Sequence, residues 1–201
     1  MHWVMAIDLK LCNGCNTCVI ACKQGNGTPP GIFWAKVLEE EVGVFPLARR
    51  VFWPMRCMQC EDAVCLEVCP TGAGYQREDG LVLIDAEKCI GCKACILACP
   101  YEARYLWEGK GSYYKDSVTP YEKQAYARHV PGAVQKCDFC ASRLDEGLQP
   151  HCVENCLTGA LSFGDIDDPN SYVNRVLGEP RVHLQLKKEL NTNPSIYYLT
   201  Y

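Results

Sequence analysis

Residues 89–100 of this chain read Cys-Ile-Gly-Cys-Lys-Ala-Cys-Ile-Leu-Ala-Cys-Pro. Four cysteines separated by two, two and three residues and closed by proline form the ligand pattern of a [4Fe-4S] cluster. The first three thiolates surround one cluster, whereas the fourth ligates the other cluster of a pair, so one such run implies a partner run. Small residues at Gly91 and Ala94 let backbone N–H groups approach the cluster, and Pro100 ends the turn that carries Cys99.

Three further groups of four cysteines occur along the chain. The first has the same spacing but is followed by lysine, the second has four residues in its middle gap, and the fourth has eleven. Each cluster takes four thiolates, so the 16 cysteines of the chain match the need of four clusters. In chain order the groups are Cys12, Cys15, Cys18 and Cys22; Cys57, Cys60, Cys65 and Cys69; Cys89, Cys92, Cys95 and Cys99; Cys137, Cys140, Cys152 and Cys156.

Disulfides, zinc and iron–sulfur clusters are the ordinary explanations for so many cysteines. The first residues show none of the features of a signal peptide, which disfavours a secreted disulfide scaffold. Zinc uses C-x2-C pairs, but rarely in runs of this form, and none of the 4 histidines has ligand spacing near them. We therefore predict four [4Fe-4S] clusters, with a zinc-binding structural module as the remote alternative.

Composition excludes two other classes of function. The formal net charge of −4 provides no basic footprint for nucleic acid. No run of 18 or more apolar residues occurs, so we expect no direct membrane span. A chain of 201 residues is long enough for one or two small domains.

The segments between the cysteine groups are predicted to be short strands and hairpins. Residues 3–9 alternate as a strand, 34–41 and 48–53 form a hairpin, 74–77 and 81–85 form a second hairpin, and 103–107 form a strand. Thr-Gly-Ala follows both the second and the fourth group, at 71–73 and 158–160. This repetition of strand, cysteine group and turn predicts an α+β fold built from repeated units.

Because the fourth cysteine of each group crosses over, the groups must pair in twos. Groups two and three are separated by little more than a hairpin and should pair, which leaves groups one and four to each other. Pairing in sequence, one with two and three with four, is the alternative. The predicted ligand sets are site 1, Cys12, Cys15, Cys18 and Cys156; site 2, Cys22, Cys137, Cys140 and Cys152; site 3, Cys57, Cys60, Cys65 and Cys99; and site 4, Cys69, Cys89, Cys92 and Cys95.

This pairing predicts two nested bacterial-type 2x[4Fe-4S] ferredoxin-like modules with an inserted loop and a C-terminal arm. The outer module comprises residues 1–30 and 130–168, and the inner module comprises 50–107. Residues 108–135 are predicted to be a surface insertion and 169–201 the arm. We favour contact with a partner for the tail 179–201 and for the tyrosines of residues 113–126, because a small electron carrier must dock at both ends; an ordered surface excursion is the alternative.

Basic residues accompany the cysteine groups. Arg56, Lys88 and Lys136 each precede a group directly, and Lys10, Lys23 and Lys93 lie close to or within others. Nearby positive charge can favour the reduced state of a cluster. Solvated charges at strand ends explain the same pattern equally well.

The order and gaps of the four groups resemble the four-cluster iron–sulfur subunit of molybdopterin oxidoreductases of the dimethyl-sulfoxide reductase superfamily. The length makes the chain most similar to the polysulfide, thiosulfate and arsenate reductase type, although Leu157 stands where that family commonly has proline. Further matching motifs are Met5-Ala6-Ile7-Asp8, Cys22-Lys23 with Asn26, Cys69-Pro70-Thr71-Gly72-Ala73, Asp79 to Asp85, Cys99-Pro100-Tyr101, and Lys136-Cys137 with Phe139.

The resemblance implies a non-catalytic electron-transfer subunit, with no catalytic residues of its own. It implies a relay of single electrons between a catalytic subunit with a molybdenum or tungsten bis-pterin cofactor and a quinone-reactive integral-membrane subunit. The expected location is a membrane-associated complex on the periplasmic side, reached by export with a partner; the cytoplasmic side is the alternative. A freestanding polyferredoxin and an electron subunit of a hydrogenase or formate dehydrogenase are the other functions considered.

Overall fold

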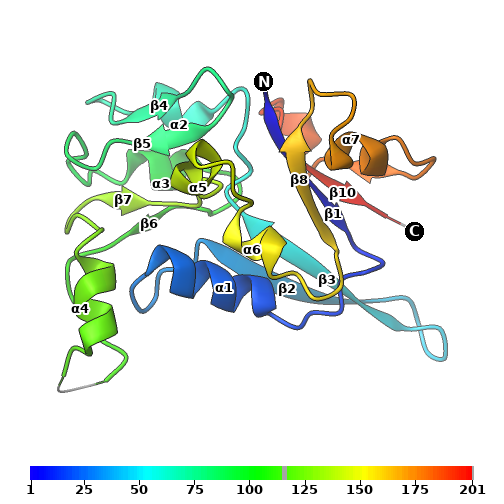
Figure 1. Cartoon of the computed structure of the whole chain (residues 1–201), viewed down its shortest axis with the longest axis horizontal. Coiled ribbons are helices and arrows are strands. Elements are labelled where there is room, and N and C mark those ends of the chain that lie inside the picture. Colours follow the sequence, from blue (N-terminus) through cyan, green and yellow to red (C-terminus); the bar gives the residue numbers. More distant parts are fainter. Residues whose placement is uncertain (115–116, 201) are drawn as a thin grey trace.

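A four-stranded sheet joins the two ends of the chain in the computed structural model, which describes residues 1–114 and 117–200. Its strand order is β8-β1-β10-β9 (Figure 1). Strand β1 (Trp3–Asp8) runs antiparallel to β8 (Leu161–Asp165) and parallel to β10 (Ile196–Leu199). Strand β9 (His183–Leu184) covers the outer edge of β10. The predicted strand over residues 3–9 is found as β1.

Both faces of β1 are buried, because apolar residues stand at nearly every position of Trp3–Asp8. Met5 and Ile7 belong to the main core, which also contains cysteines of several groups. Val4 and Ala6 face the opposite side and pack with Val173 of helix α7 (Tyr172–Leu177). Successive side chains of a strand point to opposite faces, so a strand in the middle of such a sheet is apolar throughout.

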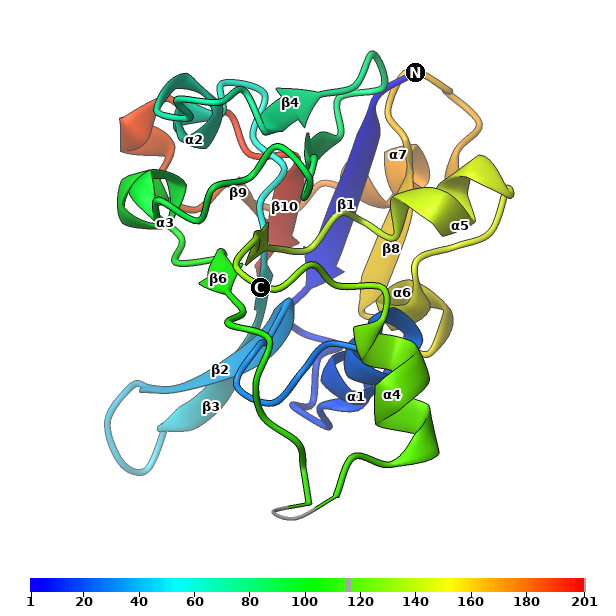
Figure 2. The same ribbon diagram turned by 90° about the vertical axis from the view of Figure 1, so that its left-hand side faces the viewer.

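A long hairpin leaves the body of the protein and returns to its core. It consists of β2 (Ala35–Val42) and β3 (Arg49–Arg56), and its tip projects beyond the other elements (Figure 2). The predicted hairpin is present, with a second strand that continues to residue 56. Because β3 runs inward over these last residues, Arg56 lies in the interior and is only 3% exposed.

Short elements surround the cysteine groups. Helix α1 (Thr17–Asn26) of group one packs on α6 (His151–Glu154) of group four, and α2 (Val64–Glu67) of group two packs on α3 (Ala94–Ala98) of group three. The remaining elements are β4 (Gly74–Gln76), β5 (Val82–Ile84), β6 (Tyr105–Leu106), β7 (Val134–Gln135), α4 (Pro120–Tyr126), α5 (Ala141–Asp145) and the 3-10 helix η1 (Lys188–Leu190). The hairpin β4–β5 is as predicted, whereas the strand predicted over 103–107 shrinks to the two residues of β6, which pairs with β7.

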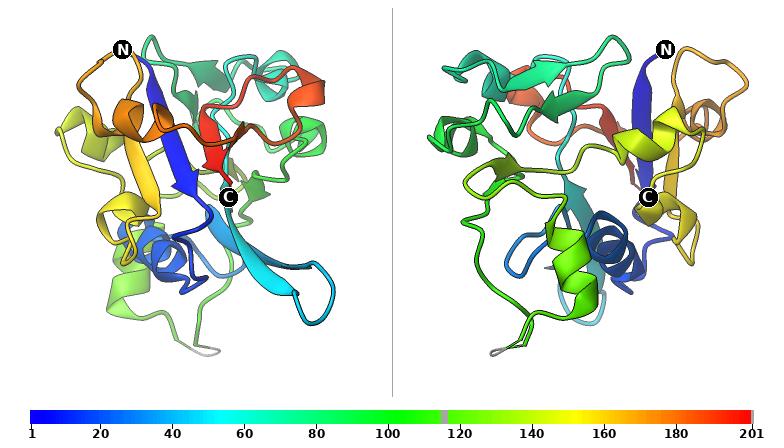
Figure 3. Two further views of the ribbon diagram at one scale, coloured as in Figure 1. Left: turned by 90° about the vertical axis from the view of Figure 1, so that its right-hand side faces the viewer. Right: turned by 60° about the vertical axis from the view of Figure 1, so that its left-hand side comes forward.

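The C-terminal segment 169–201, predicted to be an arm, is largely part of the body. Strand β10 lies beside β1 within the sheet (Figure 3), and Ile196, Tyr198 and Leu199 are fully buried. The sequence Ile-Tyr-Tyr-Leu is apolar enough to fill a central strand, and the pairing joins residues about 190 positions apart. Residue 201 of the predicted arm lies outside the described residues.

In the described part of segment 108–135, hydrogen bonds converge on one buried carboxylate. Glu122, 2% exposed, accepts hydrogen bonds from the backbone of Tyr113 and Thr119 and forms a capping box at the start of α4. Tyr113, Tyr114 and Tyr121 remain about half exposed on the surface. Residues 115 and 116 of this predicted insertion lie outside the described part of the chain.

Candidate metal centres

All four cysteine groups share one backbone turn. The residue two positions after the first cysteine adopts a left-handed conformation in each group, namely Gly14, Gln59, Gly91 and Phe139. That conformation reverses the chain so that the next cysteine faces back toward the first. Only two of the four positions are glycine, so the turn is imposed on Gln59 and Phe139 by the packing around them. Both of these residues are 1% exposed.

Gly91 is the position where glycine is required most strictly. Its φ is +66°, and a Cβ there would stand 2.4 Å from the carbonyl oxygen of Gly132. A backbone neighbour cannot move aside as a flexible side chain can. The predicted role of Gly91 in close backbone approach therefore has a specific partner, the loop before β7.

Cysteines of groups one and four lie together. Asn26, at the end of α1, donates hydrogen bonds to the sulfurs of Cys22 (3.5 Å) and Cys140 (3.8 Å). The charges of Cys152 and Cys140 act on Cys22, and those of Cys156 and Cys15 act on Cys12. Each neighbour named here lies in the same predicted ligand set as the cysteine it acts on.

Cysteines of groups two and three also lie together. A cavity is lined by Cys57, Cys60, Cys65 and Cys99, the members of predicted site 3. For site 4, the sulfurs of Cys89 and Cys69 act on Cys95. The backbone N–H of Val134 donates to Cys89 Sγ at 3.4 Å. Cys92 is exposed.

Burial governs the acidity of most of the cysteine thiols for which a shift is resolved. Burial raises the pKa of Cys22 to about 12, and the neighbouring sulfurs add to that effect. It likewise raises the pKa of Cys60 to about 12 and that of Cys140 to about 11. The pKa of Cys69 is instead lowered to about 7, mainly because the backbone N–H of Gly74 donates to its sulfur. Cluster assembly must therefore displace protons from the buried thiols.

The basic residues near the cysteine groups divide into two kinds. Lys88 is exposed and pairs with Asp85 at 2.9 Å, as a solvated strand-end charge would. Lys136 is buried and donates to the carbonyl oxygens of Val82 and Cys137, so it holds the backbone together. Arg56 alone of the three residues that precede a group contacts a sulfur, with Nη1 2.9 Å from Cys152 Sγ.

A second buried arginine was not predicted from the sequence. Arg104 is 4% exposed, and its Nη2 donates to Cys65 Sγ at 2.7 Å. It stands five residues after Cys99 and precedes no cysteine group. Its run of apolar neighbours between residues 103 and 107 suggested a strand position, and nothing local marks its contact with a residue 39 positions away.

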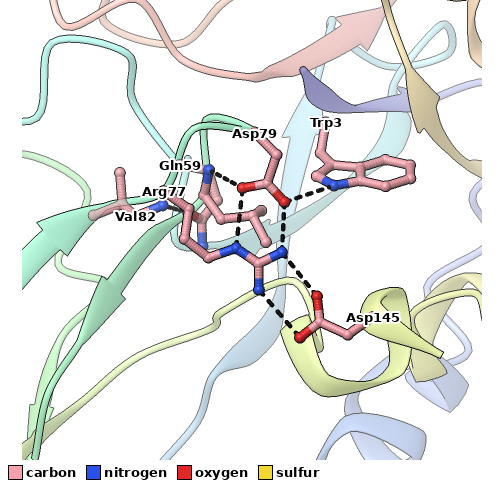
Figure 4. A network of polar contacts seen from close by, with 7 residues as sticks. Trp3, Gln59, Arg77, Asp79, Val82 and Asp145 are labelled. Carbon is pink, nitrogen blue, oxygen red and sulfur yellow. Dashed lines mark hydrogen bonds and ion pairs between the residues drawn. The ribbon is translucent and has the colours of Figure 1, made fainter. Parts of the chain in front are cut away.

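Polar contacts hold groups two and four together. The Gln59 side chain, of group two, donates to the carbonyl of Cys137 in group four (2.8 Å) and accepts from the N–H of Val82 (2.7 Å). Near Gln59 and Val82, Arg77 pairs with both Asp79 and Asp145 at 2.8 Å (Figure 4). The β4–β5 hairpin is thereby attached to α5.

The donor set fits iron–sulfur clusters. All sixteen cysteines are free of disulfides, and amide, guanidinium and backbone N–H groups point at their sulfurs, as cluster sites require. Within residues 1–114 and 117–200, no three His, Cys, Asp or Glu side chains converge closely enough to hold a single ion. The same residues include no helix with the length and apolar character needed to cross a membrane. Fold and site together define a ferredoxin-like electron carrier with four [4Fe-4S] clusters.

Comparisons with known proteins identify the family. Models described as a 4Fe-4S dicluster domain match residues 11–73, 48–115 and 112–166. The B subunit of selenate reductase from Mesobacillus selenatarsenatis is 44% identical over 100% of this chain and 72% of its own length. The B subunit of polysulfide reductase from Wolinella succinogenes is 38% identical over 96% of this chain and 91% of its own, and that of tetrathionate reductase from Salmonella typhimurium is 37% identical over 98% and 72%.

The chain therefore belongs to the iron–sulfur B subunits of molybdopterin reductases. Within such a complex it is the electron-transfer subunit and not the catalytic one. The cofactor is iron–sulfur, as the sequence predicted, and the zinc alternative is set aside.

Proposed function

We propose that the chain relays single electrons through its four clusters between a molybdenum or tungsten bis-pterin catalytic subunit and a quinone-reactive membrane subunit. One observation carries this proposal: the exposed cysteines belong to two different predicted sites, whereas the cysteines of a third predicted site are all buried. Cys15 of site 1 and Cys92 of site 4 are exposed, but all four cysteines of site 2 are buried. A relay needs two accessible ends and an insulated middle.

An exposed leucine lies next to a ligand or between ligands at each accessible end. Leu157, 77% exposed, follows Cys156 of site 1, and Leu97, 87% exposed, lies between two cysteines beside site 4. Exposed apolar residues of this size around a cluster ligand are what a protein partner would cover. Leu157 also takes the place of the proline expected there, which alters the surface and not the ligands.

The nested arrangement of two modules is part of the proposal, with the sixteen ligands divided among sites 1 to 4 as defined above. The packing of α1 on α6 and of α2 on α3 supports the pairing of groups one with four and two with three. The family models match consecutive stretches such as 11–73, which join groups one and two. Such matches follow the linear sequence, whereas the helix contacts report proximity in space.

Serine variants test this pairing directly. Under nested pairing, Cys156→Ser and Cys12→Ser alter the same cluster signal in electron paramagnetic resonance (EPR) spectra, because both residues serve site 1. Under sequential pairing, Cys69→Ser would share its signal with Cys12→Ser instead. The two outcomes exclude each other.

For the catalytic partner we infer a reductase of sulfur oxyanions or polysulfide, or of an arsenic or selenium oxyanion. The inference comes from the relatives, whose names include selenate, tetrathionate, arsenate and polysulfide reductases. We further propose that the complex is membrane-associated and faces the periplasm, with the chain exported alongside its partner.

Anaerobic purification of the native complex, followed by iron, sulfide, molybdenum, tungsten and zinc analysis, tests the relay. We expect four clusters on this chain and a copurifying molybdenum or tungsten subunit that reoxidises them when its substrate is added. A solitary chain with the same iron content would indicate a free polyferredoxin, and a copurifying hydrogenase would indicate the other alternative.

A further inference from the structure

A buried arginine lies between the two cluster sites of the outer module. Arg56, at the end of β3, donates from Nη1 to Cys152 Sγ of site 2 at 2.9 Å. Its charge also acts on Cys137 of site 2 and on Cys18 of site 1. One guanidinium is therefore close to ligands of both sites.

Two of the nitrogen atoms of Arg56 have no acceptor in the described part of the protein. Nε and Nη2 are buried and lack a hydrogen-bond partner among the described residues. An unsatisfied donor of a buried charged group is costly, so such atoms normally have a partner. Within residues 1–114 and 117–200 no carboxylate pairs with Arg56. The negative charge that balances the guanidinium therefore comes from the surrounding cysteine sulfurs and from the clusters that these sulfurs would ligate. The inorganic sulfides of the adjoining clusters are acceptors of the required kind.

A second buried arginine occupies the matching place in the inner module. Arg104 donates from Nη2 to Cys65 Sγ of site 3 at 2.7 Å. Its charge also acts on Cys57 of site 3 and on Cys95 of site 4. Each module thus contains one buried arginine whose guanidinium reaches ligands of both of its predicted sites, although the two arginines occupy unrelated positions in the sequence.

We propose that Arg56 and Arg104 set the reduction potentials of the relay, each holding one fixed positive charge between two clusters and donating hydrogen bonds to their sulfurs. Reduction adds one electron, and hence one negative charge, to a cluster. An arginine stays protonated, so no proton moves with the electron and the positive charge stabilises the reduced state. The low-dielectric interior strengthens that attraction over its value in water. This inference rests on the ligand sets proposed above.

The test is a potentiometric titration of the intact complex, followed by EPR, for the wild type, Arg56→Gln and Arg56→Lys. Arg56→Gln should shift both clusters of the outer module to more negative potentials, and the larger shift should be that of the cluster at site 2, whose ligand Cys152 accepts from Nη1. For that cluster we expect the ratio of reduced to oxidised form, at the wild-type midpoint, to fall at least tenfold, which is 59 mV for a one-electron couple. Arg56→Lys keeps the charge but loses the planar set of donors, so its shift should be smaller.

Lys88→Gln is the matched control. Lys88 also directly precedes a cysteine group, but its side chain is 64% exposed and paired with Asp85. Removal of that charge should change the same ratio less than threefold for every cluster. An Arg56→Gln complex with all clusters assembled and all potentials unchanged would overturn the inference. That result would leave the relay itself standing, because reoxidation through the catalytic partner tests the relay separately.

A second measurement covers the case in which Arg56→Gln does not assemble. The wild-type complex is labelled with ¹⁵N-arginine, reduced, and studied by pulsed EPR. A guanidinium that donates to cluster sulfur should produce a nitrogen hyperfine coupling on a reduced cluster, and the coupling from Arg56 should change in Arg56→Lys. Absence of any arginine coupling in the wild type would overturn the proposal.

Discussion

The hydrogen bonds of the buried Gln59 side chain should make a measurable contribution to the stability of the protein. The side chain is 1% exposed and joins the N–H of Val82 to the carbonyl of Cys137. Substitution Gln59→Met keeps the length and approximate volume of the side chain but removes both polar atoms. The change therefore isolates the hydrogen bonds from any effect of a cavity.

The expected cost follows from what each partner retains. The Val82 N–H loses the Gln59 oxygen, its 2.7 Å acceptor, and leaving a buried donor unsatisfied costs about 1–3 kcal/mol. The Cys137 carbonyl still accepts from Lys136, so its loss is that of an ordinary hydrogen bond, about 0.5–1.5 kcal/mol. The sum is about 1.5–4.5 kcal/mol of free energy of unfolding.

The assay is the rate at which the clusters lose their visible absorbance in denaturant, since loss of a bound cofactor makes unfolding irreversible. If these contacts break before the transition state for unfolding, about 2 kcal/mol accelerates cluster loss by roughly 30-fold. Gln76→Met is the control, because the Gln76 side chain is exposed and donates to the carbonyl of Gly80 at 3.3 Å. A Gln59→Met rate within threefold of both the wild type and this control would refute the reasoning.

Three further predictions concern single side chains. Tyr198→Phe removes a buried 2.9 Å hydrogen bond to the carbonyl of Pro54 and should cost about 1 kcal/mol in the same assay; no change in rate would contradict that role. Hydrogen bonds from Arg181 lower the pKa of Asp8, so the ionised Asp8 stabilises the fold above its unfolded pKa of about 4 and loses this effect as the pH falls through the folded value. The difference in unfolding free energy between wild type and Asp8→Asn should therefore stay constant from pH 8 down to about pH 5. A titration of that difference with its midpoint between pH 5 and pH 8 would contradict the role of Asp8. Glu122→Gln weakens the acceptor for the N–H groups of Tyr113 and Thr119, and limited proteolysis should then cut between residues 110 and 119 faster than in wild type, with unchanged cutting elsewhere.

The ligands were predictable from the sequence because their signal is local. Spacing alone identified the four groups, and the two hairpins followed from short alternating runs with turn residues between them. Of the two interpretations of the charges beside the groups, a solvated strand-end charge describes Lys88, whereas Arg56 is buried against a cysteine sulfur. Both precede a cysteine directly, and only the path of β3 into the core distinguishes them.

Other parts depend on contacts between distant residues, which local patterns do not report. Arg104 reaches a sulfur 39 residues away, and β10 pairs with β1 across nearly the whole chain. The apolar sequence of residues 196–199 is compatible with a docking segment as well as with a central strand. Strand β8 pairs with one edge of β1 and leaves the other edge free, and β10 pairs with that free edge. This arrangement makes residues 196–199 a central strand and not a docking segment.

The parallel pairing of β10 with β1 has a consequence for the order of synthesis. Met5, Ile7 and Asp8 leave the ribosome first, yet their partners Ile196, Tyr198 and Leu199 are made after every cysteine. All cysteines of groups two and three emerge more than 90 residues before those partners. We therefore expect cluster assembly to begin in the middle of the chain, before β1 can pair with β10. A chain whose translation stops before residue 196 would carry all sixteen ligands and still lack the strand that completes its sheet.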